Sequence, residues 1–380
     1  MDLVAGRAFA QERRPIRHLD PVLLLVTGGL SVVGLLSIYS STHRSLEALD
    51  ADPMIYVKKQ VAALILGLLL LLIIATVDYR FFKVYAGFIY AASVMTLVLV
   101  RLPGIGSSAN GAQRWFQFAG FQLTPSEFAK LALILMLATL LSEIRIAEPS
   151  LTDVIRVCIV ATIPMILVFI QPDIGTTIVL VAVVVGILVV AGTRLRHLLA
   201  LALTALVLVA LAFQLGVIRD YQLARLTGFL DPQNSEDTTQ YNREQAEIAV
   251  GAGGLFGRGY LAGTQTNLDF VPEQHTDFIF TVVGEEFGFV GSAFVLMLFA
   301  ILLWRAIRIS YLSKDPFGTY VAAGIASMLA IQMFVNVGMV LGIMPITGIP
   351  LPFVSYGGSA MLANFIASGL LLNVHMRRFK

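Results

Sequence analysis

Long apolar runs alternate with short polar segments along the chain, from about residue 19 to its end. Each run has about twenty residues, the length that crosses roughly 30 Å of hydrocarbon as an α-helix. The pattern predicts an all-α fold, a polytopic transmembrane helical bundle of about ten spans. We expect the spans near Leu19–Ser40, Val57–Val77, Phe81–Val100, Pro125–Ile144, Val154–Ile170, Ile174–Ala191, Leu195–Ile218, Phe278–Trp304, Phe317–Leu341 and Leu351–Val374.

The polar segments set the domain organisation. Residues 1–18 are an Arg-containing tail, and residues 19–380 form a single transmembrane domain. A large loop of residues 219–276 separates the seventh and eighth spans, and Gln240–Ala249 within it reads as a short helix. Loops of this length in compact domains are usually functional.

Lys and Arg indicate the orientation. They concentrate in the tail, in the short loops that follow even-numbered spans, and at the C-terminal end. Cytoplasmic loops carry this excess of positive charge. We therefore expect both termini to be cytoplasmic and the loop of residues 219–276 to be extracytoplasmic.

Composition excludes other classes. The chain is 57% apolar and 13% charged, which is far from a soluble domain, and its net charge of +2 gives no reason to expect a nucleic-acid partner. The single cysteine, Cys158, lies in an apolar run and rules out a disulfide framework.

The stretch Val271–Gly291, VPEQHTDFIFTVVGEEFGFVG, turns from polar to apolar at Asp277. A helix starting near Thr276 would carry one face of small residues, against which another helix could pack closely. The residues on this face are Thr281, Gly284, Gly288 and Gly291.

Asp277 has two interpretations. At the mouth of a membrane helix it could be a general base that takes a proton near neutral pH. Alternatively, it is an acid stabilised by a helix N-terminus, with Thr276 as the cap. His275 next to it is expected to be a hydrogen-bonding neighbour rather than a metal ligand, because no second His or Cys lies at ligand spacing.

Glu285 and Glu286 lie about two turns deeper in the same helix. Acids inside a span suggest a function, but ion pairing with a neighbouring helix explains them equally well. Asn336 and Gln332 could hydrogen-bond between helices. Both interpretations of the acids remain open at this point.

Arg114, Glu127 and Lys130 flank the start of the fourth span, where Thr124 and Pro125 suit a helix N-terminus. One interpretation is a cationic pocket for a phosphate group. The other is a surface Glu–Lys pair beside an interfacial aromatic, Trp115.

Two apolar segments are interrupted by Pro and Gly, at Gln171–Thr177 and Ile346–Ala360. Broken helices form substrate sites in transporters, so they favour a lipid or solute transporter as a rival class. A simpler explanation is that prolines begin these helices and small residues allow close packing.

Six segments together resemble one family. They are NGAQRW, TPSEFAK, QPDIGT, AVGAGGLFGRG, VPEQHTDFIFTVVGEEFGFVG and GIPLPFVSYGGSA. In this order they are similar to the SEDS family (shape, elongation, division and sporulation) over essentially all ten expected spans. GIPLPFVSYGGS resembles the elongation branch, RodA-like, more than the division branch. Asn242, Ala246 and Ala252 depart from common family residues, which weakens any role for those three side chains.

The resemblance implies a peptidoglycan glycosyltransferase that polymerises lipid II at the outer face of the bacterial cytoplasmic membrane, for cell elongation and shape. Asp277 matches the family's essential acid and would be the base for the acceptor sugar hydroxyl. The lipid pyrophosphate would be the leaving group. The substrate-binding candidates are Arg114, Lys130, Glu127, His275, Gln274 and Ser355.

The resemblance also implies partners: lipid II, membrane lipids, and a class B penicillin-binding protein that contacts the membrane helices. A divalent cation (Mg or Mn) could assist the departing phosphates, and no organic cofactor is expected. The alternative function is a flippase for the lipid-linked precursor, which Glu285 and Glu286 keep open because a flippase needs a polar path through the membrane.

Overall fold

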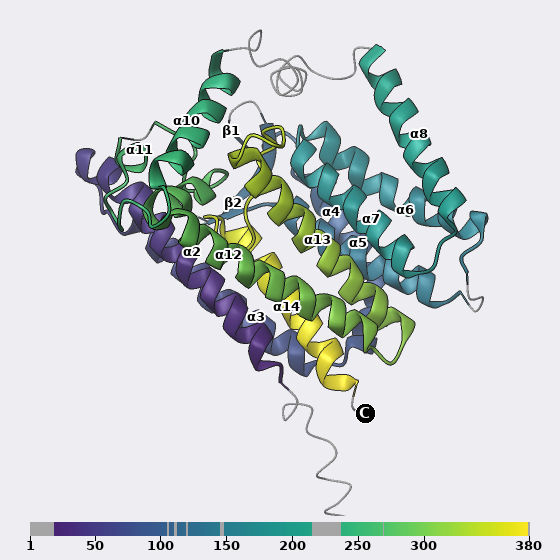
Figure 1. The fold of residues 1–380 in the computed structure, drawn as a ribbon. Helices are drawn as coiled ribbons and strands as arrows, with labels where there is room; N and C mark the ends of the chain where they lie inside the picture. Colours follow the sequence, from purple (N-terminus) through teal and green to yellow (C-terminus); the bar gives the residue numbers. More distant parts are fainter. Residues whose placement is uncertain are drawn as a thin grey trace, which may run out of the picture.

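The computed structural model describes residues 19–104, 106–109, 112–118, 121–144, 148–214, 237–268 and 270–378. In these ranges ten long apolar helices form a bundle, which confirms the predicted fold class (Figure 1). They are α2 (Pro21–Ala48), α3 (Ile55–Thr76), α4 (Tyr79–Leu99), α5 (Pro125–Ser142), α6 (Leu151–Ile170), α7 (Ile174–Val190), α8 (Leu195–Gln214), α12 (Ile279–Tyr311), α13 (Pro316–Val340) and α14 (Gly358–Arg377). The tail of residues 1–18 lies outside the described residues.

Eight of these helices are long and apolar enough to cross a membrane, and two shorter apolar segments, Ile174–Val190 and Leu195–Leu211, accompany them. The chain is a multi-pass membrane protein. Within the large loop, α10 (Asp237–Gly253) includes and extends the short helix predicted there, and α11 (Thr264–Asn267) follows it.

Helices α5, α13 and α14 are the most buried spans of the bundle. Helix α5 packs on α4, α7 and α13, α14 packs on α3, and α12 packs on α13, α10 and α2. Helix α8 stands at the edge of the bundle, and most of its described side chains are exposed (Figure 1).

The two described ends of the chain meet at one end of the bundle. Asp20, the buried N-cap of α2, forms an ion pair with Arg305 near the end of α12. Its carboxylate also lies 3.8 Å from the ring of His375 at the end of α14. An even number of spans places both ends of a chain on one side, so this contact agrees with ten crossings.

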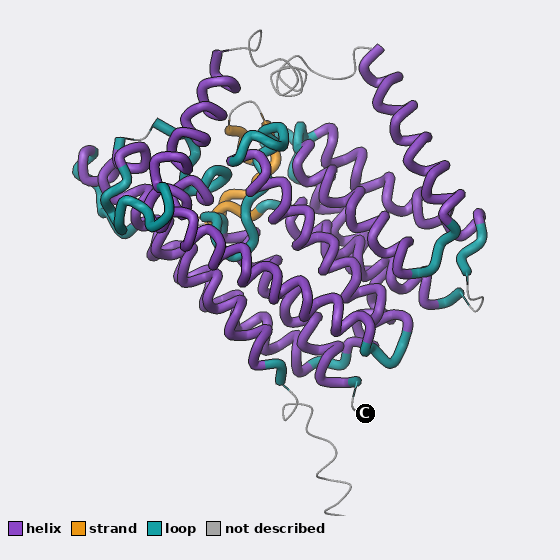
Figure 2. The backbone as a smooth tube through the Cα atoms, viewed as in Figure 1, coloured by secondary structure: helices purple, strands orange, loops and turns teal. Residues whose placement is uncertain are grey.

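Three short strands precede α5, a feature that the sequence pattern did not predict. They are β1 (Ser107–Ala109), β2 (Ala112–Phe118) and β3 (Phe121–Leu123), in the antiparallel order β1-β2-β3. Figure 2 shows them together in one small region at the loop-bearing end of the bundle. They carry the chain from α4 to the start of α5, with Arg114 on the middle strand.

Helix α12 differs from its prediction in two ways. It begins at Ile279 rather than near Thr276, because residues 273–278 form turns, and its N-cap Phe278 makes no side-chain cap bond. It is also kinked at Gly288, whose φ of 65° and ψ of −160° are not helical. The small-residue face does pack closely, but its partners are α10 and the glycine-rich segment after it.

At this kink the segment of residues 254–259 replaces helical hydrogen bonds of α12. Two N–H groups of the segment donate to carbonyls that the kink frees, and two N–H groups of α12 donate to the segment in return. The four bonds are Arg258 to Glu285 (3.0 Å), Gly259 to Glu286 (3.1 Å), Phe289 to Gly254 (2.9 Å) and Val290 to Leu255 (3.1 Å). These four bonds pair backbone groups at the broken turn within the protein, as backbone at membrane depth requires.

The tenth span also begins later than predicted. Residues 351–357 are not helical, and α14 starts at Gly358. Pro350 and Pro352 lack N–H groups, and backbone groups of this buried loop bond both to other backbone groups and to side chains. Gln60 donates to the carbonyl of Ser355 (3.1 Å) and accepts from the N–H of Gly357 (3.2 Å).

Candidate functional site

A cavity of about 1060 Å³ lies among the ends of several helices, on the side of the bundle where the strands are. Its walls come from α3, β2 and β3, the start of α5, the break between α6 and α7, the turns before α12, and the loop before α14. The two Pro- and Gly-containing interruptions in the sequence thus border one cavity.

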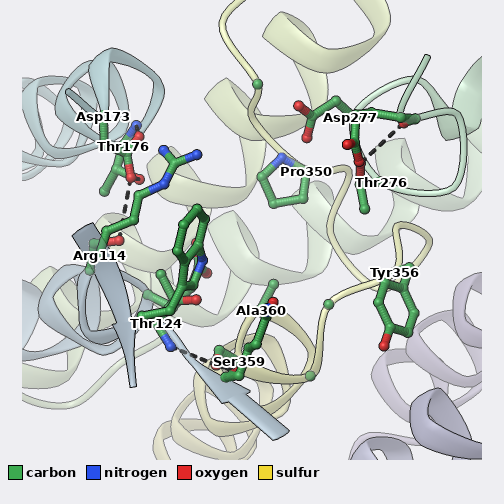
Figure 3. Close-up of a pocket in the computed structure, with 18 of the residues that line it drawn as sticks. Arg114, Thr124, Asp173, Thr176, Thr276, Asp277, Pro350, Tyr356, Ser359 and Ala360 are labelled. Atoms are coloured by element: carbon green, nitrogen blue, oxygen red, sulfur yellow. Dashed lines mark hydrogen bonds between the residues drawn. The ribbon is translucent and has the colours of Figure 1, made fainter. Parts of the chain in front are cut away.

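Asp277 lines this cavity (Figure 3). It belongs to a turn in which the N–H groups of residues 276 and 277 each donate to the carbonyl of Glu273 at 3.1 Å. The buried side chain of Asn336 on α13 donates to the backbone carbonyl of Asp277 (2.8 Å) and to that of Ile349 (2.7 Å). Asn336 thus bonds to a turn and a loop rather than to a second helix, which differs from the predicted hydrogen bond between helices. Gly348, with φ of 71°, lies so close that an added Cβ would be 3.1 Å from an Asp277 carboxylate oxygen.

Two cations, Arg114 and Lys59, line the same cavity. The Arg114 guanidinium stacks over the ring of Trp115 at 4.7 Å, and Figure 3 shows Arg114 and Asp277 on opposite sides of Pro350 in that view. Lys59 comes from α3 and was not among the residues predicted from the sequence. Its only sequence signal is a pair of lysines at the start of an apolar run, which usually marks a membrane boundary.

Glu127 also lines the cavity, but Lys130 does not. The two form an ion pair at 2.7 Å, as their spacing predicts, with side chains only 9% and 2% exposed. The alternative of a surface pair is therefore wrong, because the neighbouring helices cover this face of α5. Arg114 and Lys130 do not share one open surface.

His275 lines the cavity within a group of aromatic rings. Its ring centroid lies 5.0 Å from that of Tyr56 on α3 and 5.6 Å from that of Tyr356. The two tyrosines contact each other edge to face at 5.0 Å. Burial, and secondarily the neighbouring Tyr56, raises the pKa of Tyr356, which lies in the loop before α14. The phenol therefore stays neutral.

Gln274 and Ser355 are buried behind the cavity wall and do not line it. The Gln274 amide donates to the hydroxyls of Thr266 and Thr281, both at 3.2 Å. The Ser355 hydroxyl accepts from the N–H of Leu351 at 2.8 Å. Both side chains organise the wall rather than contact its contents.

Asp173 lines the cavity at the break between α6 and α7. Its carboxylate caps α7 by accepting from the N–H (2.9 Å) and hydroxyl (2.8 Å) of Thr176, and Ser126 at the start of α5 lies 3.4 Å away. The motif QPDIGT predicted an interruption between two helices. It did not predict that Asp173 lines the same cavity as Glu127 and Asp277.

Glu285 and Glu286 are buried, and among the described residues they accept from N–H and hydroxyl groups rather than from cations. Glu285 accepts from the backbone N–H of Gln265 (2.8 Å), and from the N–H (2.9 Å) and hydroxyl (2.8 Å) of Thr266. Glu286 accepts from the hydroxyl of Ser40 on α2. Glu285 thus connects the large loop to α12, and Glu286 connects α2 to α12. The sequence-based explanation, ion pairing with a neighbouring helix, did not predict these hydrogen bonds.

In the described part of the chain, no three His, Cys, Asp or Glu side chains come together in a way that could hold a metal ion. The cavity nevertheless joins carboxylates on one part of its wall to two cations on another. Such a wall can accept a proton from a bound hydroxyl and can neutralise a bound phosphate.

A family model described as "Cell cycle protein", covering FtsW, RodA and SpoVE, matches residues 21–380. The chain belongs to this family, which is the SEDS family. The family resemblance found in the sequence motifs is confirmed.

Among curated SEDS relatives, the chain is 36% identical to stage V sporulation protein E of Bacillus subtilis (strain 168), over 93% of this chain and 96% of that protein. It is 35% identical to peptidoglycan glycosyltransferase MrdB of Escherichia coli (strain K12), over 95% and 94%. It is also 35% identical to a probable peptidoglycan glycosyltransferase FtsW of Geobacter metallireducens, over 97% and 98%.

Two solved structures agree. One, reported as "Structural coordination of polymerization and crosslinking by a peptidoglycan synthase complex", matches with a TM-score of 0.80 and 31% identity, covering 95% of this chain and 99% of that chain. The crystal structure of the rod shape determining protein RodA from Thermus thermophilus matches with a TM-score of 0.70 and 30% identity, over 95% and 98%. This SEDS chain therefore shares the whole membrane domain of both.

Proposed function

We propose that this protein is a peptidoglycan glycosyltransferase that polymerises lipid II, and that Asp277 is its general base. The observation that carries the proposal is one cavity that holds Asp277 together with Arg114 and Lys59. Relatives named peptidoglycan glycosyltransferase match over almost the full length of this chain.

In the reaction, an acceptor sugar hydroxyl attacks the anomeric carbon of the donor, and the bond from that carbon to the lipid pyrophosphate breaks. Asp277 takes the hydroxyl proton, and the pyrophosphate leaves with the electron pair. The pyrophosphate is already a good leaving group, so no general acid is obligatory. Arg114 and Lys59 would stabilise its charge; an arginine can hold two phosphate oxygens, whereas a lysine acts as a point charge. Attack opposite an α-linked leaving group gives a β linkage.

The remaining predicted site residues fit less direct roles. Glu127 and His275 are candidates for contact with the sugar, since both line the cavity. Lys130 would act by holding Glu127, while Gln274 and Ser355 would shape the wall.

A divalent cation is a further proposal. Mg²⁺ is usually held by one or two carboxylates together with substrate phosphates, so the absence of a three-residue cluster among the described residues is compatible with it. Asp277 or Glu273 on the cavity wall could contribute a carboxylate, and the ion would supply additional positive charge near the phosphates.

Cellular role and partner are the finer parts of the proposal. The GIPLPFVSYGGS motif supports a role in elongation, with both termini cytoplasmic and the cavity at the outer face. A solved relative belongs to a complex that couples polymerization to crosslinking, which supports a class B penicillin-binding protein as partner through the membrane helices.

A lipid-linked-precursor flippase is the second candidate, because it also requires polar groups inside the membrane. Glu285 and Glu286 were the feature that favoured it. Glu285 accepts hydrogen bonds from the loop, Glu286 accepts one from α2 through one of its oxygens, and neither lines the cavity, which weakens this alternative.

Purified protein in detergent, given labelled lipid II, tests the proposal. A polymerase should lengthen glycan chains in micelles, because it needs no gradient and no sidedness. A flippase has no net reaction there. Polymer on a gel supports the glycosyltransferase. If no polymer forms, but lipid II is transferred across the bilayer of liposomes, the flippase is supported.

The same assay with EDTA, then with Mg²⁺ or Mn²⁺ added back, tests whether polymerisation requires a divalent cation.

A further inference from the structure

A buried chain of hydrogen bonds connects Glu285 on α12 to the turn that carries Asp277. The Glu285 carboxylate accepts the hydroxyl of Thr266 at 2.8 Å. The Thr266 oxygen accepts from the Gln274 amide nitrogen at 3.2 Å. The same nitrogen donates to Thr281 at 3.2 Å, and the Thr281 hydroxyl donates to the carbonyl of Phe278 at 2.6 Å.

The direction of this chain is fixed at both ends. A carboxylate and a backbone carbonyl can only accept, so the hydroxyl protons of Thr266 and Thr281 point outward along the chain. Each hydroxyl oxygen then has only lone pairs left for the group between them. That group must donate twice, and the NH₂ of Gln274 does so. A glutamate in place of Gln274 would have a similar shape, but its carboxylate could not donate these two hydrogen bonds.

The chain is sealed from solvent. Glu285 and Thr281 are fully buried, and Thr266 and Gln274 are each 2% exposed. Water cannot replace a hydrogen bond lost here as it would on a surface, so breaking one leaves a buried polar group unpaired. Gln274 lies between Glu273, whose carbonyl accepts the N–H of Asp277, and Asp277 itself. Holding Gln274 thus holds the turn that aims the Asp277 side chain.

We propose that Glu285 is a positioning residue for Asp277, acting through Thr266 and Gln274. This inference rests on the proposed function of Asp277 as the base. In this role the buried acid is the acceptor that anchors the large loop and, through it, the turn of the reacting carboxylate.

Thr266 offers the sharpest test, because Thr266→Val keeps the shape and removes only the hydroxyl, whereas Thr266→Ser keeps it. The backbone N–H of Thr266 still reaches Glu285 in both variants. We expect Thr266→Val to lower the saturating polymerisation rate about ten- to a hundredfold, since small displacements of catalytic groups have effects of that size. The KM for lipid II should change little, and Thr266→Ser should restore most of the rate.

Thr162→Val is the matched control, because the Thr162 hydroxyl bonds only back to Cys158 in its own helix. Rates are normalised to monodisperse protein from size exclusion. Glu285→Gln, which turns an NH₂ toward N–H donors, should also lower the rate. The double variant Thr266→Val, Glu285→Gln should fall well short of the product of the two single losses, as expected for members of one chain.

If Thr266→Val does not give monodisperse protein, Gln274→Met interrupts the same chain of hydrogen bonds by removing the amide that donates in its middle, and decides the test. Asp277→Asn is measured in parallel to separate the two claims. Inactive Asp277→Asn beside fully active Thr266→Val would overturn the positioning role and leave the proposed function standing. Active Asp277→Asn would overturn both.

Discussion

Asn336 on α13 donates its side-chain amide to the backbone carbonyl of Asp277 at 2.8 Å, and also to that of Ile349. One fully buried side chain thereby ties together the turn before α12 and the loop before α14. The carboxylate proposed as the base is held from behind, through its own backbone, while its side chain faces the cavity. Its position depends on three separate parts of the chain.

Asn336→Asp should disrupt this contact while keeping the side chain's shape. A carboxylate cannot donate, so two buried carbonyls would lose their partner and face a new negative charge. We expect a loss of about 1–3 kcal/mol in stability per unsatisfied group, and a lower rate per folded molecule. Thermal unfolding in detergent and the polymerisation assay measure the two effects. An unchanged melting temperature and rate would show that the contact is dispensable.

Asp277→Asn should abolish glycan polymerisation and leave folding and membrane insertion near normal. The amide keeps the shape but does not accept the hydroxyl proton, and loss of a general base typically lowers rates by about 10²–10⁴. Gel analysis of polymer made by the purified variant measures this. Polymer formation within a few-fold of the original protein would exclude Asp277 as the base.

Arg114→Ala should weaken lipid II polymerisation, and Arg114→Lys should restore it only in part. The planar guanidinium can hold two phosphate oxygens and stacks on Trp115, and a lysine does neither equally well. The rate at several lipid II concentrations separates weaker binding from slower reaction. Lys59→Ala, on the part of the wall that α3 supplies, is the companion variant. Full rescue by lysine would indicate charge steering alone.

Lys130→Met should act on stability rather than on substrate. It leaves the Glu127 carboxylate buried beside an apolar side chain, and breaking a buried pair from one side typically costs about 3–5 kcal/mol. Adding Glu127→Gln to Lys130→Met should recover part of the lost melting temperature. If Lys130→Met stays stable but binds lipid II poorly, the lysine contacts substrate after all.

Gly288→Ala should destabilise the contact between α12 and residues 254–259. The Gly288 conformation, φ 65° and ψ −160°, is accessible essentially to glycine alone, and its use by another residue costs about 1–3 kcal/mol. An added Cβ would also lie 2.3 Å from the N–H nitrogen of Gly257. Gly28→Ala on α2 is the control, because nothing lies within 4 Å of its added Cβ. Equal melting temperatures for both variants would contradict this account of the kink.

Much of the fold follows from local sequence. Apolar runs of span length form helices because a bilayer demands internal backbone hydrogen bonds, so the existence and order of the ten helices could be predicted, although several of their ends could not. Asp277, Arg114 and Glu127 could be singled out because each is a charged residue beside an apolar run, within a segment that resembles a family motif. The family resemblance was likewise readable from motifs alone.

The tertiary structure decided what the local pattern leaves open. Lys59 joins the cavity because α3 packs against α14, and Lys130 leaves it because neighbouring helices cover α5. The non-helical loop at residues 351–357 depends partly on Gln60, far away in sequence, which bonds the carbonyl of Ser355 and the N–H of Gly357. Likewise, α12 can break at Gly288 only because residues 254–259 supply the missing bonds. Hydrogen bonds and burial of this kind depend on segments that meet only in the folded bundle, so periodicity along one segment carries no signal for them.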